Sequence, residues 1–351
     1  MKRIALGVAL GVALGVALGA CHHTSGTSPP DSSSIDSGGG GRAIRVMIVD
    51  MFALEGSPIV TALGLTQQLS VNGVTVNCNS DDVCELVTGM GYANAAASMT
   101  ALIYNHQQLD LTRTYFVIGG IAGIDPAQGT IGTAAWAHYA VDFGYANELD
   151  AREMPAGWPY GYFGVGTTSP SSPPTGDYRG TFELDAGFLQ AALAITKSVA
   201  LEDSAMAMTV RASYPSPPAN QPPVVTQCDV VSSDTWFAGT ALVQRARDWM
   251  KLATTNAGTF CTSAQEDNAT LEVLARGAAA GQLDFARVAL LRTASDFSAP
   301  YPDQTDADAL LASLADGGLT PAVDNIAKTI APLATAIAGD WSDWQSGVPA
   351  M

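Results

Sequence analysis

Apolar runs followed by helical patterns recur along the first part of the chain. Residues 44–49 form a mostly apolar run, interrupted only by Arg45, and the turn residues 56–58 come after it. Apolar residues then follow at helical spacing, at Ile59, Leu63, Leu65 and Leu69. A short apolar run bounded by turn residues is typical of a strand buried on both faces, so this segment predicts a strand and then a helix.

Two further runs repeat this arrangement. Glu85–Thr88 predicts a second strand, and the Ala-rich stretch Asn94–Asn105 predicts the helix after it. Tyr115–Ile118 predicts a third strand, and glycines follow both strands. Strands that alternate with helices and end in glycine favour an α/β fold with a mainly parallel or mixed central sheet flanked by helices.

The second half of the chain continues without a domain linker. Residues 154–177 are rich in Pro, Gly, Tyr and Ser, which predicts a long surface excursion. Helices are expected at residues 185–199, 240–252, 271–280 and 321–341, and a late strand at 286–291. Since no internal repeat interrupts residues 44–351, we expect a single domain there.

The N-terminus predicts export and lipidation. Two basic residues precede an uncharged apolar run, which is the pattern of a signal peptide over residues 1–20. The run ends in Leu-Gly-Ala-Cys, and this resembles a lipobox in which Cys21 is lipidated. Residues 21–43 are polar and rich in Ser and Gly, which predicts a flexible tether. We expect a membrane-anchored lipoprotein on the periplasmic side of the outer membrane or at the cell surface. An ordinary signal or an uncleaved anchor with an incidental Cys is the alternative.

The charge balance narrows the classes of function. The 351 residues include 33 Asp and Glu but only 16 Lys and Arg, a net charge of −17. A field of this sign repels phosphate backbones, so we expect no nucleic-acid partner. No later stretch has 18 uncharged apolar residues, so membrane contact is expected through the lipid anchor only.

The cysteines and histidines predict disulfides rather than metal. Four His and five Cys are too scattered for a zinc cluster, so we expect no metal site. Besides Cys21, the chain has Cys78, Cys84, Cys228 and Cys261, an even number that suits two disulfides in an exported protein. Three pairings are possible, and the close spacing favours Cys78 with Cys84. Free buried thiols are the alternative.

Carboxylates stand near the predicted strand ends. Glu55 follows the first strand, residues 266–268 precede a helix, and Asp296 follows the late strand. Ligands of parallel sheets collect at the carboxyl ends of strands, so these groups could supply a proton donor and a hydroxyl acceptor. Helix capping or exposure to solvent is the alternative for each of them.

A glycine-rich segment follows the third predicted strand. Its residues Gly119, Gly120, Ala122 and Gly123 predict a flexible loop near the nucleophile, where backbone N–H groups can approach a ligand. The segment has neither the Lys of a phosphate-binding P-loop nor the spacing of a dinucleotide fingerprint. We therefore expect no cofactor.

Six blocks of sequence, in the same order along the chain, resemble the nucleoside phosphorylase and nucleosidase superfamily. The blocks are residues 48–55, 88–96, 118–124, 233–237, 266–269 and 292–296. Within that superfamily, residues 265–271 and 291–297 are similar to the purine nucleoside permease family. The resemblance spans residues 45–300 and implies a nucleoside phosphorylase-like fold that cleaves the N-glycosidic bond of purine nucleosides.

The resemblance also implies roles for single residues. Asp296 matches the aspartate that protonates the departing purine near N7, which lowers the barrier to bond cleavage. Asp267 falls where the superfamily has a glutamate that accepts hydrogen bonds from the ribose hydroxyls, and Glu266 could share or take that role. The expected base-binding residues are Trp236, Asn268 and Ser295.

Glu55 aligns with the glutamate by which hydrolytic members activate water. Phosphorolytic members instead place Gly and Arg near this point to hold phosphate, and no Arg adjoins residues 56–58 here. This favours water. Phosphate remains possible as a co-substrate, since an arginine could come from another loop or from a neighbouring subunit of a homo-oligomer. The candidates are Arg113, Arg152, Arg179 and Arg211.

The expected function is therefore cleavage of purine nucleosides by an exported lipoprotein that supports nucleoside uptake. An N-ribosyl hydrolase is favoured over a phosphorylase. The alternative is a non-catalytic lipoprotein that binds nucleosides and passes them to a transporter. The carboxylates at Glu55 and Asp296 favour catalysis, because a binder needs neither.

Overall fold

The computed structural model describes residues 40–105, 107–175 and 179–350, which belong to one compact unit. The predicted signal peptide, Cys21 and most of the predicted tether lie outside the described residues. The chain is already paired at β1 (Arg42–Ala43), which lies parallel to β6 (Leu109–Asp110). The folded part thus begins slightly before the predicted start at residue 44.

Four parallel strands form the centre of a twelve-stranded sheet. Strand β2 (Val46–Asp50) lies between β5 (Val83–Val87) and β7 (Tyr115–Ile124), and β16 (Val288–Phe297) pairs with β7. Antiparallel pairs extend the sheet at its edges, so it is mixed. The predicted α/β fold is confirmed.

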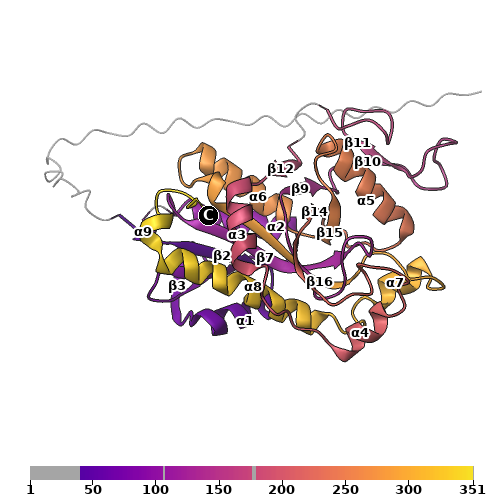
Figure 1. Ribbon diagram of the computed structural model, residues 1–351. Coiled ribbons are helices and arrows are strands. Elements are labelled where there is room, and N and C mark those ends of the chain that lie inside the picture. Colours follow the sequence, from indigo (N-terminus) through magenta and orange to yellow (C-terminus); the bar gives the residue numbers. More distant parts are fainter. Residues whose placement is uncertain (1–39, 106, 176–178, 351) are drawn as a thin grey trace, which may run out of the picture. The chain divides into compact units, whose positions relative to one another are not determined.

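Strand β2 contributes to two hydrophobic cores, one on each face of the sheet. Val46 and Ile48 point into a core shared with α1 (Ala53–Leu63) and α8 (Leu319–Gly339). Met47 and Val49 point into the opposite core, which is shared with α2 (Tyr92–Ile103) and α6 (Asp267–Ala279). Figure 1 shows the two pairs of helices on opposite sides of the sheet. Since every residue of β2 is buried, the continuous apolar run of the sequence follows from the need to fill both cores.

Strand β7 joins the two parts of the sheet. Its first four residues pair with β2, its last two pair with antiparallel β15 (Phe260–Ala264), and β16 follows it along most of its length. The part beyond β15 contains β14 (Asp229–Ser232), β9 (Tyr139–Asp142) and β12 (Thr181–Glu183). Because β7 changes its pairing partner from β2 to β15, the carboxyl ends of β2 and β15 lie in one region. The second halves of β7 and β16 lie there too.

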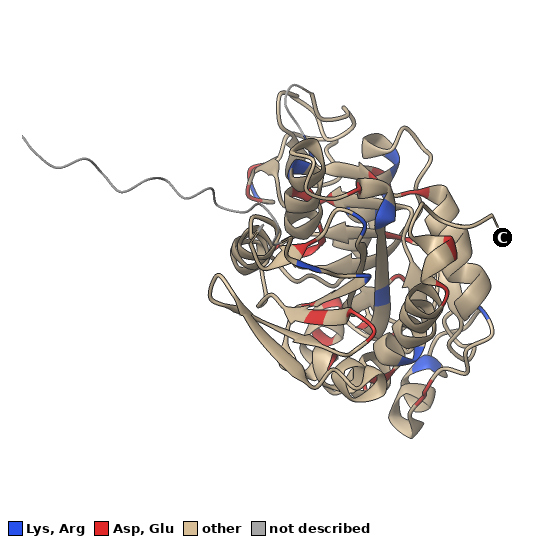
Figure 2. Ribbon diagram, turned by 90° about the vertical axis from the view of Figure 1, so that its left-hand side faces the viewer, with Lys and Arg blue, Asp and Glu red and all other residues tan. Residues whose placement is uncertain are grey.

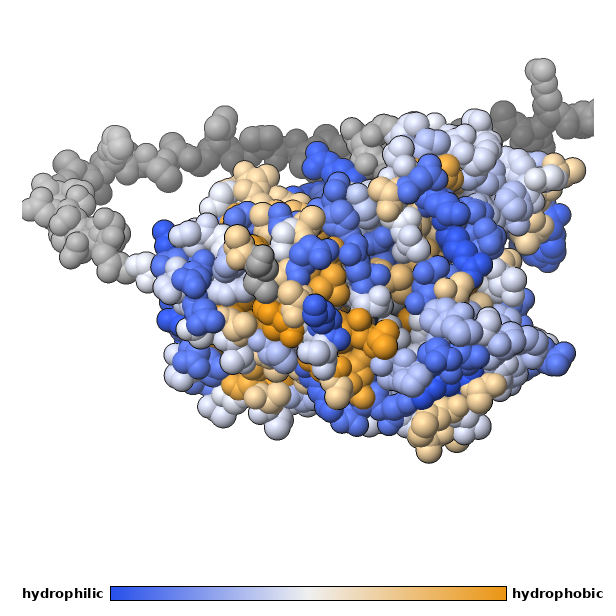
Figure 3. Space-filling view, viewed as in Figure 1, coloured by the Kyte–Doolittle hydropathy of each residue, from blue (hydrophilic) through white to orange (hydrophobic). Residues whose placement is uncertain are grey.

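The remaining elements surround this sheet. The strands are β3 (Gln67–Val71), β4 (Val74–Cys78), β8 (Ala134–Trp136), β10 (Ala146–Glu148), β11 (Tyr162–Gly164) and β13 (Val225–Gln227). The helices are α3 (Ala186–Thr196), α4 (Ala205–Arg211), α5 (Thr240–Ala253), α7 (Asp306–Ala312), α9 (Trp341–Trp344) and the 3-10 turn η1 (Phe285–Arg287). Lys and Arg positions are spread over several elements (Figure 2). In the view of Figure 3, apolar surface gathers near the middle of the face.

Three of the predicted elements differ from the structure in ways that change how a named residue is placed. The helix predicted to reach Leu69 ends at Leu63, because Gly64 adopts a left-handed conformation with φ 61° and Leu69 lies on β3. The third strand runs on to Ile124, so its glycines lie in a strand and the predicted loop was wrong. The late strand runs on to Phe297, which makes Asp296 a strand residue rather than one that follows the strand.

Two disulfides cross-link the sheet. Cys78 on β4 bonds to Cys84 on β5, which is its cross-strand partner, and this confirms the favoured pairing. Cys228 bonds to Cys261 on β15, next to the site described below.

Candidate active site

A cavity of about 460 Å³ lies where β2, β7, β15 and β16 come together. Four charged or titratable side chains line it: Glu55, Glu266, Arg292 and Asp296. The rest of the wall is mostly apolar and includes Met51, Phe52, Met90, Ile121, Trp236, Leu310, Leu314 and Leu319. A largely apolar cavity with a few convergent polar groups is the usual form of a small-molecule site.

Glu55 lies in the first turn of α1, and three backbone N–H groups hold its carboxylate. Its Oε2 accepts hydrogen bonds from the N–H groups of Met51 (2.9 Å) and Phe52 (3.3 Å), and its Oε1 accepts one from Ile121 (2.7 Å). The side chain is only 1% exposed. Burial raises the pKa of Glu55 to about 7, although Arg292 and these hydrogen bonds act in the opposite direction. A carboxyl with this pKa can act as a general base near neutral pH.

Asp296 is the second buried carboxyl of the cavity. Its Oδ2 accepts a hydrogen bond from Ser295 Oγ (2.8 Å), whereas its Oδ1 has no hydrogen-bond partner among the described residues. Burial raises the pKa of Asp296 to about 7, opposed by the Ser295 hydrogen bond and assisted by the negative charge of Asp316. Asp296 can therefore hold a proton near neutral pH and offer it to a ligand.

Arg292 forms a buried ion pair with Asp267. Its Nε lies 3.0 and 3.2 Å from the two carboxylate oxygens, Nη2 also contacts Asp267, and Nη1 donates to the Ile121 carbonyl (3.0 Å). Both side chains are almost fully buried. Arg292 was assigned no role from the sequence, although an arginine directly after the four apolar residues 288–291 was a signal that it is paired inside the fold.

Glu266, and not Asp267, reaches the cavity. Asp267 is absent from the cavity wall because its carboxylate faces Arg292 behind that wall. Glu266 lines the cavity, accepts a hydrogen bond from Gly91 N–H (3.1 Å) and lies 3.5 Å from Arg292 Nη2. Of the two residues expected to bind the ribose, Glu266 therefore lines the cavity and Asp267 does not.

Of the three predicted base-binding residues, two line the cavity. Trp236 and Ser295 do so, and Ser295 also supports Asp296. Asn268 does not, because its amide donates to the Gly180 carbonyl (2.9 Å) and its carbonyl oxygen accepts from Ser232 Oγ (2.6 Å). Asn268 therefore lies outside this cavity, and its side chain links Ser232 to Gly180.

The glycine-rich segment lies behind the cavity wall as part of β7. A Cβ on Gly120 would collide with Arg292 Nη1, and one on Gly123 would lie 2.9 Å from Ser263 Oγ and 3.2 Å from Asp296 Oδ1. Gly119 lies against α8, and buried Ala122 accepts from Ser295 Oγ (3.2 Å). These residues thus allow close packing behind the carboxyl groups. Ile121 is the residue of this segment that contacts both side chains. Its N–H donates to Glu55, and its carbonyl oxygen accepts from Arg292. The sequence did not single out Ile121.

None of the four arginines considered for phosphate lines the cavity. Arg113 and Arg152 are exposed, Arg211 pairs with Asp203, and Arg179 lines a different hollow beside Tyr92. Among the described residues that line the cavity, Arg292 is the only Lys or Arg, and Asp267 already holds it.

Asp50 is a further buried carboxyl near this site. It ends β2, is fully buried, and neither carboxylate oxygen has a hydrogen-bond partner among the described residues. Burial, followed by the negative charges of Glu55 and Glu85, raises the pKa of Asp50 well above its usual range.

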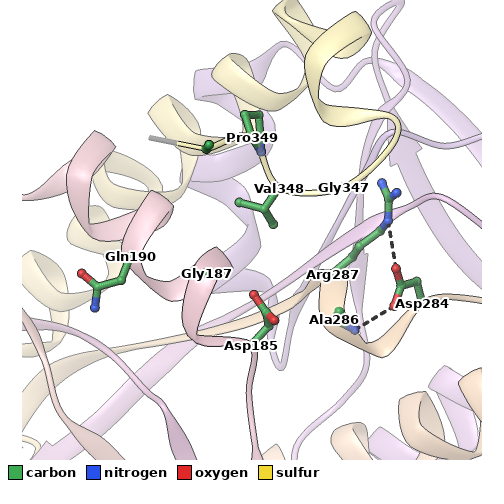
Figure 4. A pocket seen from close by; sticks show the side chains of 10 residues that line it. Asp185, Gly187, Gln190, Asp284, Ala286, Arg287, Gly347, Val348 and Pro349 are labelled. Carbon is green, nitrogen blue, oxygen red and sulfur yellow. Dashed lines mark hydrogen bonds and ion pairs between the residues drawn. The ribbon is translucent and has the colours of Figure 1, made fainter.

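A larger hollow of about 520 Å³ lies away from these carboxyl groups, between α3, η1 and the C-terminal segment (Figure 4). Its Arg287 is committed to Asp284 and to the carbonyl groups of Arg113, Trp344 and Gln345.

In the part of the chain that the structure describes, no group of three His, Cys, Asp or Glu side chains could hold a metal ion. No helix there is long and apolar enough to cross a membrane.

The fold of this chain resembles the folds of two solved enzymes. The 5'-methylthioadenosine/S-adenosylhomocysteine nucleosidase of Neisseria meningitidis superimposes with a TM-score of 0.52 at 14% identity, over 83% of this chain and 99% of that one. Futalosine hydrolase of Helicobacter pylori gives a TM-score of 0.53 at 13% identity, over 84% and 98% of the two chains.

The chain belongs to the purine nucleoside permease family, whose model matches residues 43–349. It is 33% identical to a purine nucleoside permease of Candida albicans over 316 residues, covering 86% of this chain and 77% of that protein. A probable purine nucleoside permease of Schizosaccharomyces pombe is likewise 33% identical over 320 residues, covering 86% and 90%.

Proposed function

We propose that this protein hydrolyses the N-glycosidic bond of purine nucleosides. The observation that carries the proposal is a pair of buried carboxyl groups, Glu55 and Asp296, which line one cavity from different elements. Glu55 is fixed by three backbone N–H groups, and Asp296 keeps one oxygen free of protein partners among the described residues. A base and an acid at the same cavity are what this reaction requires.

In the proposed reaction, water attacks C1′ of the ribose while the bond from C1′ to the purine nitrogen breaks. Glu55 accepts a proton from the attacking water, and Asp296 gives its proton to N7 of the departing purine. The products are ribose and the free base. The sugar becomes oxocarbenium-like in the transition state and develops positive charge. Nearby negatively charged carboxylates stabilise that charge.

The remaining residues of the cavity are suited to hold the substrate. Glu266 offers carboxylate oxygens to the ribose hydroxyls, because it reaches the cavity where Asp267 does not. Trp236 offers a flat face to the purine. The names of the family members, which refer to purine nucleosides, support this substrate class.

Water is favoured over phosphate because no Lys or Arg is left unpaired among the described residues that line the cavity. A phosphate would need positively charged or N–H donors to hold it. Arg292 is already paired with Asp267, and the N–H groups of Met51, Phe52 and Ile121 are already occupied by Glu55.

The test is incubation of the purified protein with inosine, adenosine and guanosine, with and without phosphate. We expect free base and ribose in both conditions. Ribose 1-phosphate that forms only with phosphate would show a phosphorylase instead, and intact nucleosides in all conditions would contradict an enzymatic role.

A second candidate function is nucleoside binding in support of transport, which is favoured by the permease name of the relatives. In that case equilibrium dialysis should show tight binding of a nucleoside that is recovered unchanged. The acid and base pair at Glu55 and Asp296 would then have no task, which is why we favour the enzyme.

We further propose that the protein acts outside the cytoplasm, attached through a lipidated Cys21. The lipobox-like sequence and the polar residues after it support this proposal. Two acyl chains give stable anchoring. The variant Cys21→Ser should leave the membrane fraction or remain unprocessed, and an unchanged distribution and mass would contradict the anchor.

A further inference from the structure

Three segments that are distant in sequence line the cavity together. Met90 comes from the turn between β5 and α2, Trp236 from the loop after β14, and Gln265 and Glu266 from the junction of β15 and α6. Segments from separate parts of the chain keep their positions through contacts with one another. The contacts among these three segments therefore set the shape of this part of the cavity.

Met90 is placed by the backbone of its turn. Its side chain lines the cavity although it is 61% exposed. Gly89 and Gly91, on either side of it, both adopt left-handed conformations, with φ 89° and 85°. The carbonyl of Met90 accepts a hydrogen bond from Asn94 Nδ2 (2.8 Å), which belongs to α2. The turn is therefore tied to α2, and the position of the start of α2 determines where Met90 lies at the cavity.

Three hydrogen bonds join the three segments in a closed ring. Asp234 Oδ1 accepts one from the N–H of Tyr92 at the start of α2 (2.7 Å), and the Asp234 carbonyl accepts one from Gln265 Nε2 (2.8 Å). Glu266 Oε1 accepts the third, from the N–H of Gly91 (3.1 Å). Asp234 takes part in two of the three bonds, and it is not among the described residues that line the cavity.

The carboxylate of Asp234 suits its place at the start of α2. The first N–H groups of a helix have no partner within the helix, and the helix dipole favours a negative charge there. Hydrogen bonds to an ionised acceptor are stronger than neutral ones. Gly91 allows the close approach, since a Cβ there would lie 3.1 Å from Asp234 Oδ1. The bond from Tyr92 to Asp234 therefore holds the start of α2 against the loop that carries Trp236.

We propose that Asp234 is a positioning residue for the bound nucleoside, which acts by holding the Met90 turn at the cavity. This role rests on the proposed function, in which the cavity takes a purine nucleoside. The two carboxyl groups proposed for catalysis, Glu55 and Asp296, are held by hydrogen bonds from other segments. Asp234 therefore contributes to the affinity for the nucleoside rather than to the chemical step.

The direct test is the Kd for inosine, measured by isothermal titration calorimetry in the Asp296→Asn background, in which the ligand is not consumed. Adding Asp234→Ala should weaken binding about three- to tenfold, which corresponds to the loss of one hydrogen bond. Asp234→Asn keeps an oxygen that can accept from Tyr92, so it should restore most of the affinity. The matched control is Asp110→Ala, which removes an exposed carboxylate that accepts the N–H of Thr112 (3.0 Å), away from the cavity, and should leave the Kd unchanged.

A double-mutant cycle tests whether Asp234 acts through Met90. In a Met90→Ala background the side chain that Asp234 positions is already lost, so Asp234→Ala should weaken inosine binding by a smaller factor than it does when Met90 is present. A general loss of stability would instead weaken binding equally in both backgrounds. Circular dichroism confirms that each variant is folded. Equal factors in the two backgrounds would overturn the proposed role.

Steady-state kinetics with Asp296 intact gives a separate readout. Asp234→Ala should raise KM for inosine and leave kcat nearly unchanged. An unchanged Kd in folded Asp234→Ala, or an equal loss of affinity in Asp110→Ala, would overturn the role of Asp234. Inosine that the wild type binds but does not cleave would reject the proposed hydrolysis alone, since the Kd values would still decide the role of Asp234. A wild type that binds no inosine would overturn both.

Discussion

Arg292, which lines the cavity, binds through Nε the two carboxylate oxygens of buried Asp267 at 3.0 and 3.2 Å. Of the two neighbouring carboxylates at 266 and 267, the pair leaves only Glu266 lining the cavity. Arg292 is the only Lys or Arg among the described residues of the wall, and Asp267 already holds its guanidinium. Gly120 is part of this arrangement, because any side chain there would collide with the guanidinium.

Removing Arg292 should strongly destabilise the protein. In Arg292→Met the carboxylate of Asp267 is left buried and unpaired, which costs about 3–5 kcal/mol. Urea denaturation measures the loss. The control is Arg276→Met, which breaks an exposed pair with Glu272 and should cost about 0–1 kcal/mol. Equal losses of unfolding free energy in the two variants would show that the buried pair contributes no more to stability than the exposed pair.

The rate of cleavage should follow a bell-shaped pH profile centred near pH 7. Glu55 must be deprotonated to accept a proton from water, so activity falls as pH drops through its pKa of about 7. Asp296 must be protonated, so activity falls as pH rises through its pKa of about 7. On each side kcat/KM should fall about tenfold per pH unit. A flat profile from pH 5 to pH 9 would be incompatible with this pair of roles.

Asp296→Asn should lower turnover by about 10² to 10⁴ and leave nucleoside binding largely intact. The amide has nearly the same shape but cannot deliver a proton. Steady-state kinetics separates the two effects, since the loss should appear in kcat more than in KM. Near wild-type turnover in the folded variant would remove Asp296 from the mechanism.

Asp50→Asn should stabilise the protein, and more so at pH 7 than at pH 4. Because burial raises the pKa of Asp50 in the folded state, the unfolded chain loses this proton first as pH rises, and wild-type stability declines. The amide has no proton to lose. Melting temperatures at the two pH values test this, and a variant that is less stable at pH 7 would show that Asp50 is ionised in the fold. Activity should persist, because Asp50 does not line the cavity.

Residues whose surroundings are set by their own strand or helix could be predicted from the sequence. The apolar run that fills both cores identified β2, and the close spacing of Cys78 and Cys84 identified their disulfide. Glu55 and Asp296 were found through the order of short motifs, and both line the cavity.

The errors concern relationships between segments that are distant in sequence. Asp267 and Glu266 are neighbours on the chain, and only the position of Arg292 decides which of them faces the cavity. The glycines of β7 were mistaken for a loop because their packing partners, Arg292 and α8, lie about 170 or more residues further along. Asn268 was misplaced for the same reason, since its partner Gly180 belongs to another segment.

The central claim is that water, activated by Glu55, is the nucleophile. The most direct measurement is the mass of the sugar formed from inosine in H₂¹⁸O with phosphate present. We expect ribose that carries ¹⁸O at C1, and a loss of about 10² to 10⁴ in its rate of formation in Glu55→Gln, with exposed Glu153→Gln as the unaffected control. Ribose 1-phosphate without ¹⁸O, formed at a similar rate by Glu55→Gln, would contradict the account.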